Sequence, residues 1–171
     1  MQARHFNAIV LSSKAALAAL VAVPCYDLFG LAGAVWAAIS AVLVIHTGLH
    51  PSLRASLMRV VANLIGALIG AVCIEFSGHT LTAMAAGVLL TGLICHLARL
   101  DDAVRPAYAA VVIVTFTTGG GKDAWTEPFE RVFAVLIGCA SSLIVSFLMD
   151  NLLCRFKLSP AGDETSHGTS E

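Results

Sequence analysis

The chain contains 171 residues, of which 58% are apolar and 12% are charged, and its mean hydropathy is +0.86. A soluble domain carries about 25% charged residues, so the 10 basic and 11 acidic side chains here are too few to cover a water-soluble fold of this length. The net charge of -1 also excludes a nucleic-acid-binding protein, which needs a basic face to neutralise phosphates. The composition predicts a protein that lies in a lipid bilayer.

Charges, glycines and prolines divide the chain into six apolar segments of about the 17–25 residues that cross a bilayer. The expected helices cover residues 8–28, 29–45, 57–76, 80–98, 103–118 and 129–149. The fifth segment is the weakest, because Arg105-Pro106 leaves only a short apolar run before the glycines at 119–121. The sequence therefore predicts an all-α, polytopic membrane protein with a six-helix transmembrane module over residues 1–158.

The two ends of the chain have different characters. The first segment could be mistaken for a signal peptide, but Lys14 interrupts it and no Ala-x-Ala site follows Pro24-Cys25, so we expect it to remain as the first helix. Residues 159–171 are rich in Ser, Thr and Gly and are predicted to form a disordered cytoplasmic tail. The five cysteines are odd in number, form no CxxC pair and are interpreted as small packing residues.

The distribution of Lys and Arg predicts the orientation, because short loops rich in these residues stay in the cytoplasm. With the N-terminus inside, eight of the ten basic residues lie on the cytoplasmic side, and only Lys122 and Arg131 lie outside. The sequence therefore predicts a multi-pass protein of the cell inner membrane with both termini in the cytoplasm.

Small residues recur at every fourth position of the third and sixth segments, and this spacing lets helix backbones approach closely. They are Ala62, Gly66 and Gly70 on the third, and Ala134, Gly138, Ser142 and Ser146 on the sixth. We interpret them as helix-packing faces rather than as parts of a pore, and we expect both helices to be central.

The same two segments begin alike. Residues 59–66 and 131–138 agree at six of eight positions with an offset of 72, and this offset also aligns residues 36–39 with 108–111. Three helices per copy would place the copies in opposite orientations, which is an inverted repeat of the kind found in transporters. In this 3+3 repeat, Arg59 corresponds to Arg131 and Trp36 to Tyr108.

Three parts of the sequence form recognisable motifs, namely Trp36-Ala37-Ala38-Ile39, His50-Pro51-Ser52-Leu53, and the run from Arg59 through Gly66 to Gly70. Together they resemble the N-terminal membrane module of the fusaric acid resistance and aromatic acid exporter family. Ala62-Asn63 stands where that family usually has Gly-Thr. The resemblance implies an inner-membrane exporter of aromatic or other organic carboxylic acids.

The expected partners are a small organic anion, the lipid bilayer, a second copy in a homodimer or higher homo-oligomer, and a periplasmic adaptor protein. A passive organic-anion channel and a non-transporting membrane assembly subunit stay open as alternatives. An enzyme is not expected, because no Ser/His/Asp or Cys/His group stands in a motif context. We expect no cofactor, and the glycines before Lys122 lack the first Gly of a phosphate loop.

Five residues are candidates for binding the substrate. Arg59 and Arg131 begin Gly-containing helices, and a guanidinium suits a carboxylate, although both could be interfacial. Trp36 and Tyr108 could stack on a substrate ring or serve in packing. Lys14 lies inside an apolar segment, where an ionisable group is costly, but it could also extend to the interface.

Three further residues are candidates for proton coupling or gating. His46 and His50 are four positions apart, but no carboxylate or Cys accompanies them, so a proton-sensitive gate is preferred to a metal site. Glu75 lies near the expected outer end of the third helix, where it could take part in proton coupling or be interfacial. No metal ligand is predicted.

Overall fold

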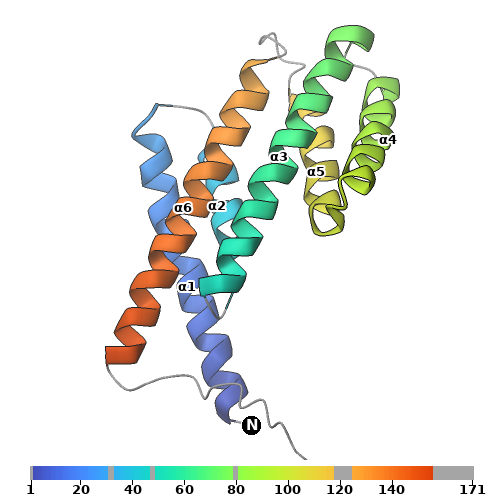
Figure 1. Ribbon diagram of the computed structural model, residues 1–171. Coiled ribbons are helices and arrows are strands. Elements are labelled where there is room, and N and C mark those ends of the chain that lie inside the picture. The colour runs from blue at the N-terminus through green and yellow to red at the C-terminus, as the bar shows by residue number, and fades with distance from the viewer. Residues whose placement is uncertain (1, 31–32, 47–48, 79–80, 118–124, 156–171) are drawn as a thin grey trace, which may run out of the picture.

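The computed structural model describes residues 2–30, 33–46, 49–78, 81–117 and 125–155. They form six α-helices, α1 (Gln2–Asp27), α2 (Ala34–Val44), α3 (Leu49–Ser77), α4 (Leu81–Leu97), α5 (Asp101–Thr117) and α6 (Thr126–Arg155) (Figure 1). All regular structure in the described ranges is helical, so the prediction of an all-α fold with six helices is confirmed for them.

Successive helices run in opposite directions along one bundle. In Figure 1, α1 and α3 begin toward the lower end of the bundle, α2 ends there, and α6 runs from the upper end back to the end where α1 begins. We call these the lower end and the upper end. The first and last helices therefore reach the lower end together.

The six helices pack as two groups of three, with the third and last helices exchanged between them. α6 packs against α1 and α2, whereas α3 packs against α4 and α5. An extensive contact between α3 and α6 joins the two groups. Each half of the chain thus contributes its final helix to the group formed by the other half.

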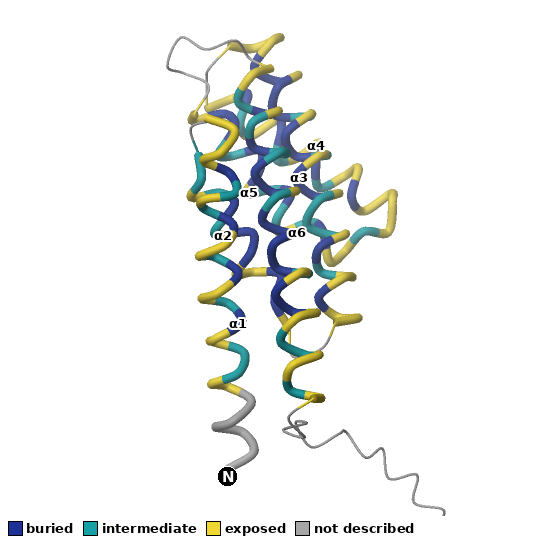
Figure 2. The backbone as a smooth tube through the Cα atoms, turned by 90° about the vertical axis from the view of Figure 1, so that its left-hand side faces the viewer, coloured by how far each residue is buried: buried dark blue, intermediate teal, exposed yellow. Residues whose placement is uncertain are grey.

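Glycines allow this exchange. A Cβ atom placed on Gly66 would meet the backbone carbonyl oxygen of Ala107 in α5, and one placed on Gly138 would meet the carbonyl oxygen of Ala37 in α2. Because backbone cannot move aside as a side chain can, both contacts require glycine. Ten residues of α3 and ten of α6 are accordingly buried, against four of α4. Exposed residues dominate α4 (Figure 2).

The outer surface of the bundle is apolar. Large hydrophobic side chains such as Leu28, Phe76 and Leu89 are exposed. Among the described residues, three helical segments are long and apolar enough to cross a membrane, at Ala8–Asp27, Leu49–Ser77 and Thr126–Arg155. α2 and α4 are apolar but shorter. An apolar exterior of this kind is stable only where lipid replaces water.

The helix boundaries differ from expectation mainly at α2, α3 and α6. α2 begins at Ala34 rather than at 29, because the chain turns after α1 through Gly30 and Gly33, which have positive φ angles of 66° and 125°. α3 begins eight residues before the expected position 57, and Pro51 lies in its first turn, where a missing N–H is tolerated. α6 also begins earlier, with Pro128 in its first turn, and continues to Arg155. The expected disordered tail and the loop at 118–124 lie outside the described residues.

Replacement of Gly66 tests the backbone contact between α3 and α5. We expect Gly66→Ala to destabilise the protein by about 1–3 kcal/mol, because the added methyl group has no room against a carbonyl oxygen. Gly70→Ala is the matched control on the same helix, since its Cβ would first meet the Val114 side chain at 3.2 Å. Thermal unfolding of the purified protein in detergent measures both effects. Equal melting temperatures for the two variants would contradict the contact.

Candidate functional site

Two arginines lie on opposite sides of the point where α3 and α6 cross. Arg59 stands one helical turn before Asn63 on α3, and Arg131 stands one turn before Val135 on α6. Since the two helices are antiparallel, Arg59 lies toward the lower end and Arg131 toward the upper end. Their positive charges are near enough to repel each other.

Packing contacts establish the crossing. Below it, Cys139 of α6 donates a weak hydrogen bond over 3.9 Å to the backbone carbonyl of Ser56 on α3. Above it, Val132 of α6 packs against a cluster that contains Ala67 and Ile74 of α3. The sequence before Asn63 in α3 therefore meets the later part of α6, and the sequence after Asn63 meets the earlier part.

Arg131 is buried, and it forms no ion pair with any carboxylate of the described residues. The residue is 6% exposed, and its guanidinium carbon lies 4.3 Å from the centre of the Trp36 ring in α2. Nε and Nη1 have no hydrogen-bond partner among the residues that the structure describes. Burying donors of a cation in this way is costly unless an anion or another acceptor reaches them. Nε and Nη1 of Arg131 are thus available to an anion or another acceptor that reaches them.

Arg59 is partly buried and makes a different contact. Its Nε donates a hydrogen bond to Ser40 Oγ of α2 over 3.3 Å. Asn63 donates from Nδ2 to the Arg59 carbonyl oxygen over 2.9 Å, and its own Oδ1 is buried without a partner in the described chain. Arg59 is therefore held in place through a neutral hydroxyl, and it forms no ion pair with the residues that the structure describes.

A pocket of about 370 Å³ opens beside Arg59 at the lower end. Apolar side chains, among them Leu43, Met58 and Pro106, form much of its wall. At its rim, Arg54 and Asp102 form an exposed ion pair over 3.2 Å. This volume and lining suit a small organic molecule with an apolar body, and Arg59 could bind its anionic group. We call this the Arg59 pocket.

A second pocket lies beside Arg131 at the upper end and is far smaller, about 30 Å³. Trp36, Ile113, Glu127 and Glu130 contribute to its lining. Such a volume holds little more than a water molecule. We call this the Arg131 pocket.

Five lining positions correspond between the two pockets. The α3 and α6 positions differ by 72, in the pairs Ala55 and Glu127, Met58 and Glu130, and Arg59 and Arg131. The α2 and α5 positions differ by 70, in the pairs Leu43 and Ile113, and Trp36 and Pro106. The glycine contacts give the same offset, because Ala107 lies 70 positions after Ala37.

An offset of 70 aligns Trp36 with Pro106, whereas the expected offset of 72 aligns it with Tyr108. Tyr108 instead has its hydroxyl against Gly92 of α4 and lines neither pocket. The structure therefore brings Arg131 and Trp36 together but separates Tyr108 from them.

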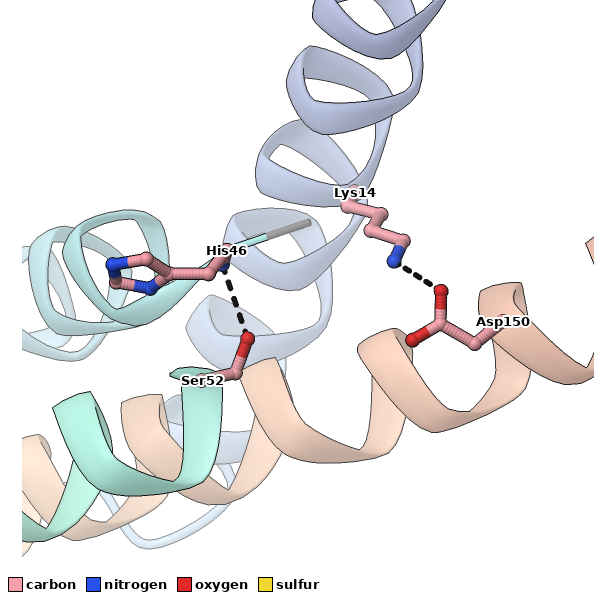
Figure 3. Close-up of polar contacts among 4 residues, drawn as sticks. All are labelled: Lys14, His46, Ser52 and Asp150. Carbon is pink, nitrogen blue, oxygen red and sulfur yellow. Dashed lines mark hydrogen bonds and ion pairs between the residues drawn. The ribbon is translucent and has the colours of Figure 1, made fainter. Parts of the chain in front are cut away.

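Lys14 forms an ion pair that sequence reasoning did not identify. Its side chain is 1% exposed, and Nζ lies 2.5 Å from Asp150 Oδ1, so the pair joins α1 to α6 (Figure 3). Lys14 lines neither pocket. The only sequence signal for this contact was the presence of one acidic residue near the end of another apolar helix.

Of the three gating candidates, His46 lines the Arg59 pocket, and the other two do not. The backbone N–H of His46 donates to Ser52 Oγ over 3.0 Å (Figure 3), and its ring Nδ1 lies 2.9 Å from the Val44 carbonyl oxygen. His50 is exposed near the start of α3, and Glu75 is exposed near its end. Within the described residues, no group of three His, Cys, Asp or Glu side chains could hold a metal ion.

The Lys14–Asp150 pair predicts an asymmetric response to mutation. Asp150→Asn leaves an unpaired Lys14 ammonium that is almost fully buried, and we expect it to cost about 3 kcal/mol of stability. Lys14→Met leaves a carboxylate that is 35% exposed and stays hydrated, so its expected cost is about 1 kcal/mol or less. Thermal unfolding in detergent compares the two variants. A larger loss for Lys14→Met would contradict the assigned burial.

Comparison with known proteins agrees with the apolar exterior of the bundle. The family model described as "Aromatic acid exporter family member 1" matches residues 9–149, which include all of α2 to α5 and most of α1 and α6. No curated protein and no solved structure matches the chain. The matched region covers most of the chain, which is therefore a member of the aromatic acid exporter family, a family of membrane transport proteins.

Proposed function

We propose that the protein exports aromatic or other organic carboxylic acids across the cell inner membrane, with Arg59 and Arg131 as successive binding sites for the carboxylate. The observation that carries the proposal is the buried Arg131 guanidinium, whose Nε and Nη1 have no partner in the described chain. Arg59 at the corresponding position opens into a pocket large enough for a small organic acid. Membership of the aromatic acid exporter family supports organic acid transport as the function.

An inverted repeat of three helices would explain why the two sites correspond. The exchanged packing of α3 and α6 has the same form in both halves, because each packs against the first two helices of the other half. The corresponding pocket residues and the two glycine contacts support a half-turn that relates the halves. In such a protein, two similar conformations of opposite orientation open each pocket in turn.

The pockets in this structure are unequal, and we interpret this as one of those two conformations. The Arg59 pocket is open and the Arg131 pocket is nearly closed. If the lower end faces the cytoplasm, as the Lys and Arg distribution predicts, this is the conformation that accepts substrate from the cell. A second copy in a homodimer would enclose the path that six short helices leave open, and a periplasmic adaptor protein stays an expected partner.

Reporter fusions test the orientation. We expect a reporter placed after Phe76 to be detected outside and one placed after Met149 to be detected in the cytoplasm, because α3 ends at the upper end and α6 at the lower end. An alkaline phosphatase reporter is active outside and a fluorescent protein reporter inside. The opposite pattern at either site would overturn the six-helix topology.

Substitution of the arginines tests the function. We expect Arg59→Gln and Arg131→Gln each to lower benzoate transport into everted membrane vesicles about 10- to 100-fold at equal protein abundance, since a hydrogen bond to a charged group contributes about 1.5–3 kcal/mol. Arg59→Lys should restore part of the rate, because the charge returns without the planar guanidinium. Arg155→Gln is the control, since Arg155 is exposed at the end of α6 and lines neither pocket.

Three results would contradict the proposal. Transport by both Gln variants at the parental rate would show that the arginines serve only as structural or interfacial residues. Benzoate flux that follows voltage and does not respond to an imposed pH gradient would favour the passive channel. Absence of any transport would favour a non-transporting assembly subunit.

A further inference from the structure

The two pockets differ at three corresponding positions around their arginines. Beside Arg59 these positions hold Ala55, Met58 and Pro106, and beside Arg131 they hold Glu127, Glu130 and Trp36. The Arg59 pocket is therefore lined by small or apolar side chains where the Arg131 pocket has two carboxylates and an indole.

These replacements reverse the charge of the lining. Among the described residues, the Asp, Glu, Lys and Arg side chains that line the Arg59 pocket are Arg54, Arg59 and Asp102, whose formal charges sum to +1. The described residues of these types in the Arg131 pocket are Glu127, Glu130 and Arg131, whose formal charges sum to -1. An organic anion is attracted by the first pocket, whereas in the second the two carboxylates oppose the attraction of Arg131.

Trp36 adds a steric difference. Its ring lies over the Arg131 guanidinium at 4.3 Å, so an anion must displace the indole before it can use that face of the cation. The corresponding residue beside Arg59 is Pro106, which is shorter and has no aromatic face. Arg59 is thus open to its pocket, whereas Arg131 is covered.

We propose that the Arg59 pocket is the high-affinity site where an organic anion loads and that the Arg131 pocket is a low-affinity site from which it is released, with Glu127, Glu130 and Trp36 setting the difference. The proposal rests on the proposed function and adds the residues that determine the side of tighter binding. Low affinity at the upper end speeds release and limits rebinding. It does not by itself drive net transport, which still requires a gradient.

The test is the half-saturation concentration of radiolabelled benzoate from each side of the membrane, in everted and in right-side-out vesicles. In the parent protein we expect saturation from the Arg131 side to require about tenfold more benzoate than saturation from the Arg59 side. The double variant Glu127→Gln/Glu130→Gln should lower the half-saturation concentration on the Arg131 side about tenfold. On the Arg59 side, the half-saturation concentration should stay within about twofold of the parental value. Trp36→Ala should also lower the half-saturation concentration on the Arg131 side.

A reciprocal variant keeps the test valid if the double variant does not fold. Met58→Glu introduces a carboxylate at the position that corresponds to Glu130, and we expect it to raise the half-saturation concentration about tenfold on the Arg59 side only. Asp27→Asn is the control, because Asp27 is an exposed carboxylate at the end of α1 that lines neither pocket. It should leave both values unchanged.

Three results would overturn the inference. One is equal half-saturation from both sides in the parent, and another is an unchanged value on the Arg131 side when both carboxylates are neutralised. Either result, combined with a loss of transport in Arg59→Gln, would leave the proposed function standing and remove only the asymmetry. The third is a parent that shows no saturable benzoate transport in either orientation, which would remove both.

Discussion

The absence of a side chain at Gly66 and Gly138 is the constraint on which the rest of the bundle depends. Each glycine lets its helix meet the backbone of a helix from the other half of the chain. Each also stands seven residues, about two helical turns, after its arginine. The close contact therefore fixes both how the halves interlock and how far Arg59 and Arg131 lie from that contact. A larger residue at either glycine would move helix and arginine together.

The three buried or partly buried cations of the bundle are accommodated in three different ways. Lys14 is paired with a carboxylate, Arg59 donates to the Ser40 hydroxyl, and Arg131 lies against the Trp36 ring. A carboxylate neutralises a cation, but a hydroxyl and an aromatic face leave its charge in place. Within the described chain, an ion pair thus neutralises the charge of Lys14, whereas no ion pair neutralises the charge of either arginine.

Local sequence patterns predicted the elements of this fold better than the contacts between them. The lengths of the apolar segments indicated six helices. The similarity of residues 59–66 to residues 131–138 indicated that the third and sixth helices are related. The offset of 72 could not be extended to α2 and α5, because the connection between α5 and α6 differs in length from the one between α2 and α3. Helical register is kept within a helix, whereas a connection can gain residues without disturbing the packing.

The contacts that the sequence did not predict join residues far apart along the chain. Lys14 and Asp150 are separated by 136 positions, and no periodic pattern relates them. Ser40 and Asn63 were also overlooked beside Arg59, since single polar residues in apolar helices give no indication of which cation they will meet. Glu127 and Glu130 lie in the first turns of α6, where acidic residues are expected from the helix dipole alone. Their position in a pocket became apparent only from the assembled helices.

The shortness of α2 has an electrical consequence. Its 11 residues span about 16 Å, roughly half of the 30 Å hydrocarbon thickness of a bilayer. Trp36, near its first turn, faces one pocket, and Leu43, near its last, faces the other, so the pockets approach each other from the two ends of this short helix. Where water fills one of these pockets, the membrane potential falls across the protein that remains beyond it rather than across the full bilayer. An elementary charge that crosses the whole membrane potential gains or loses about 2.3 kcal/mol per 100 mV. A carboxylate that moves between the two arginines would experience most of that energy in this single step.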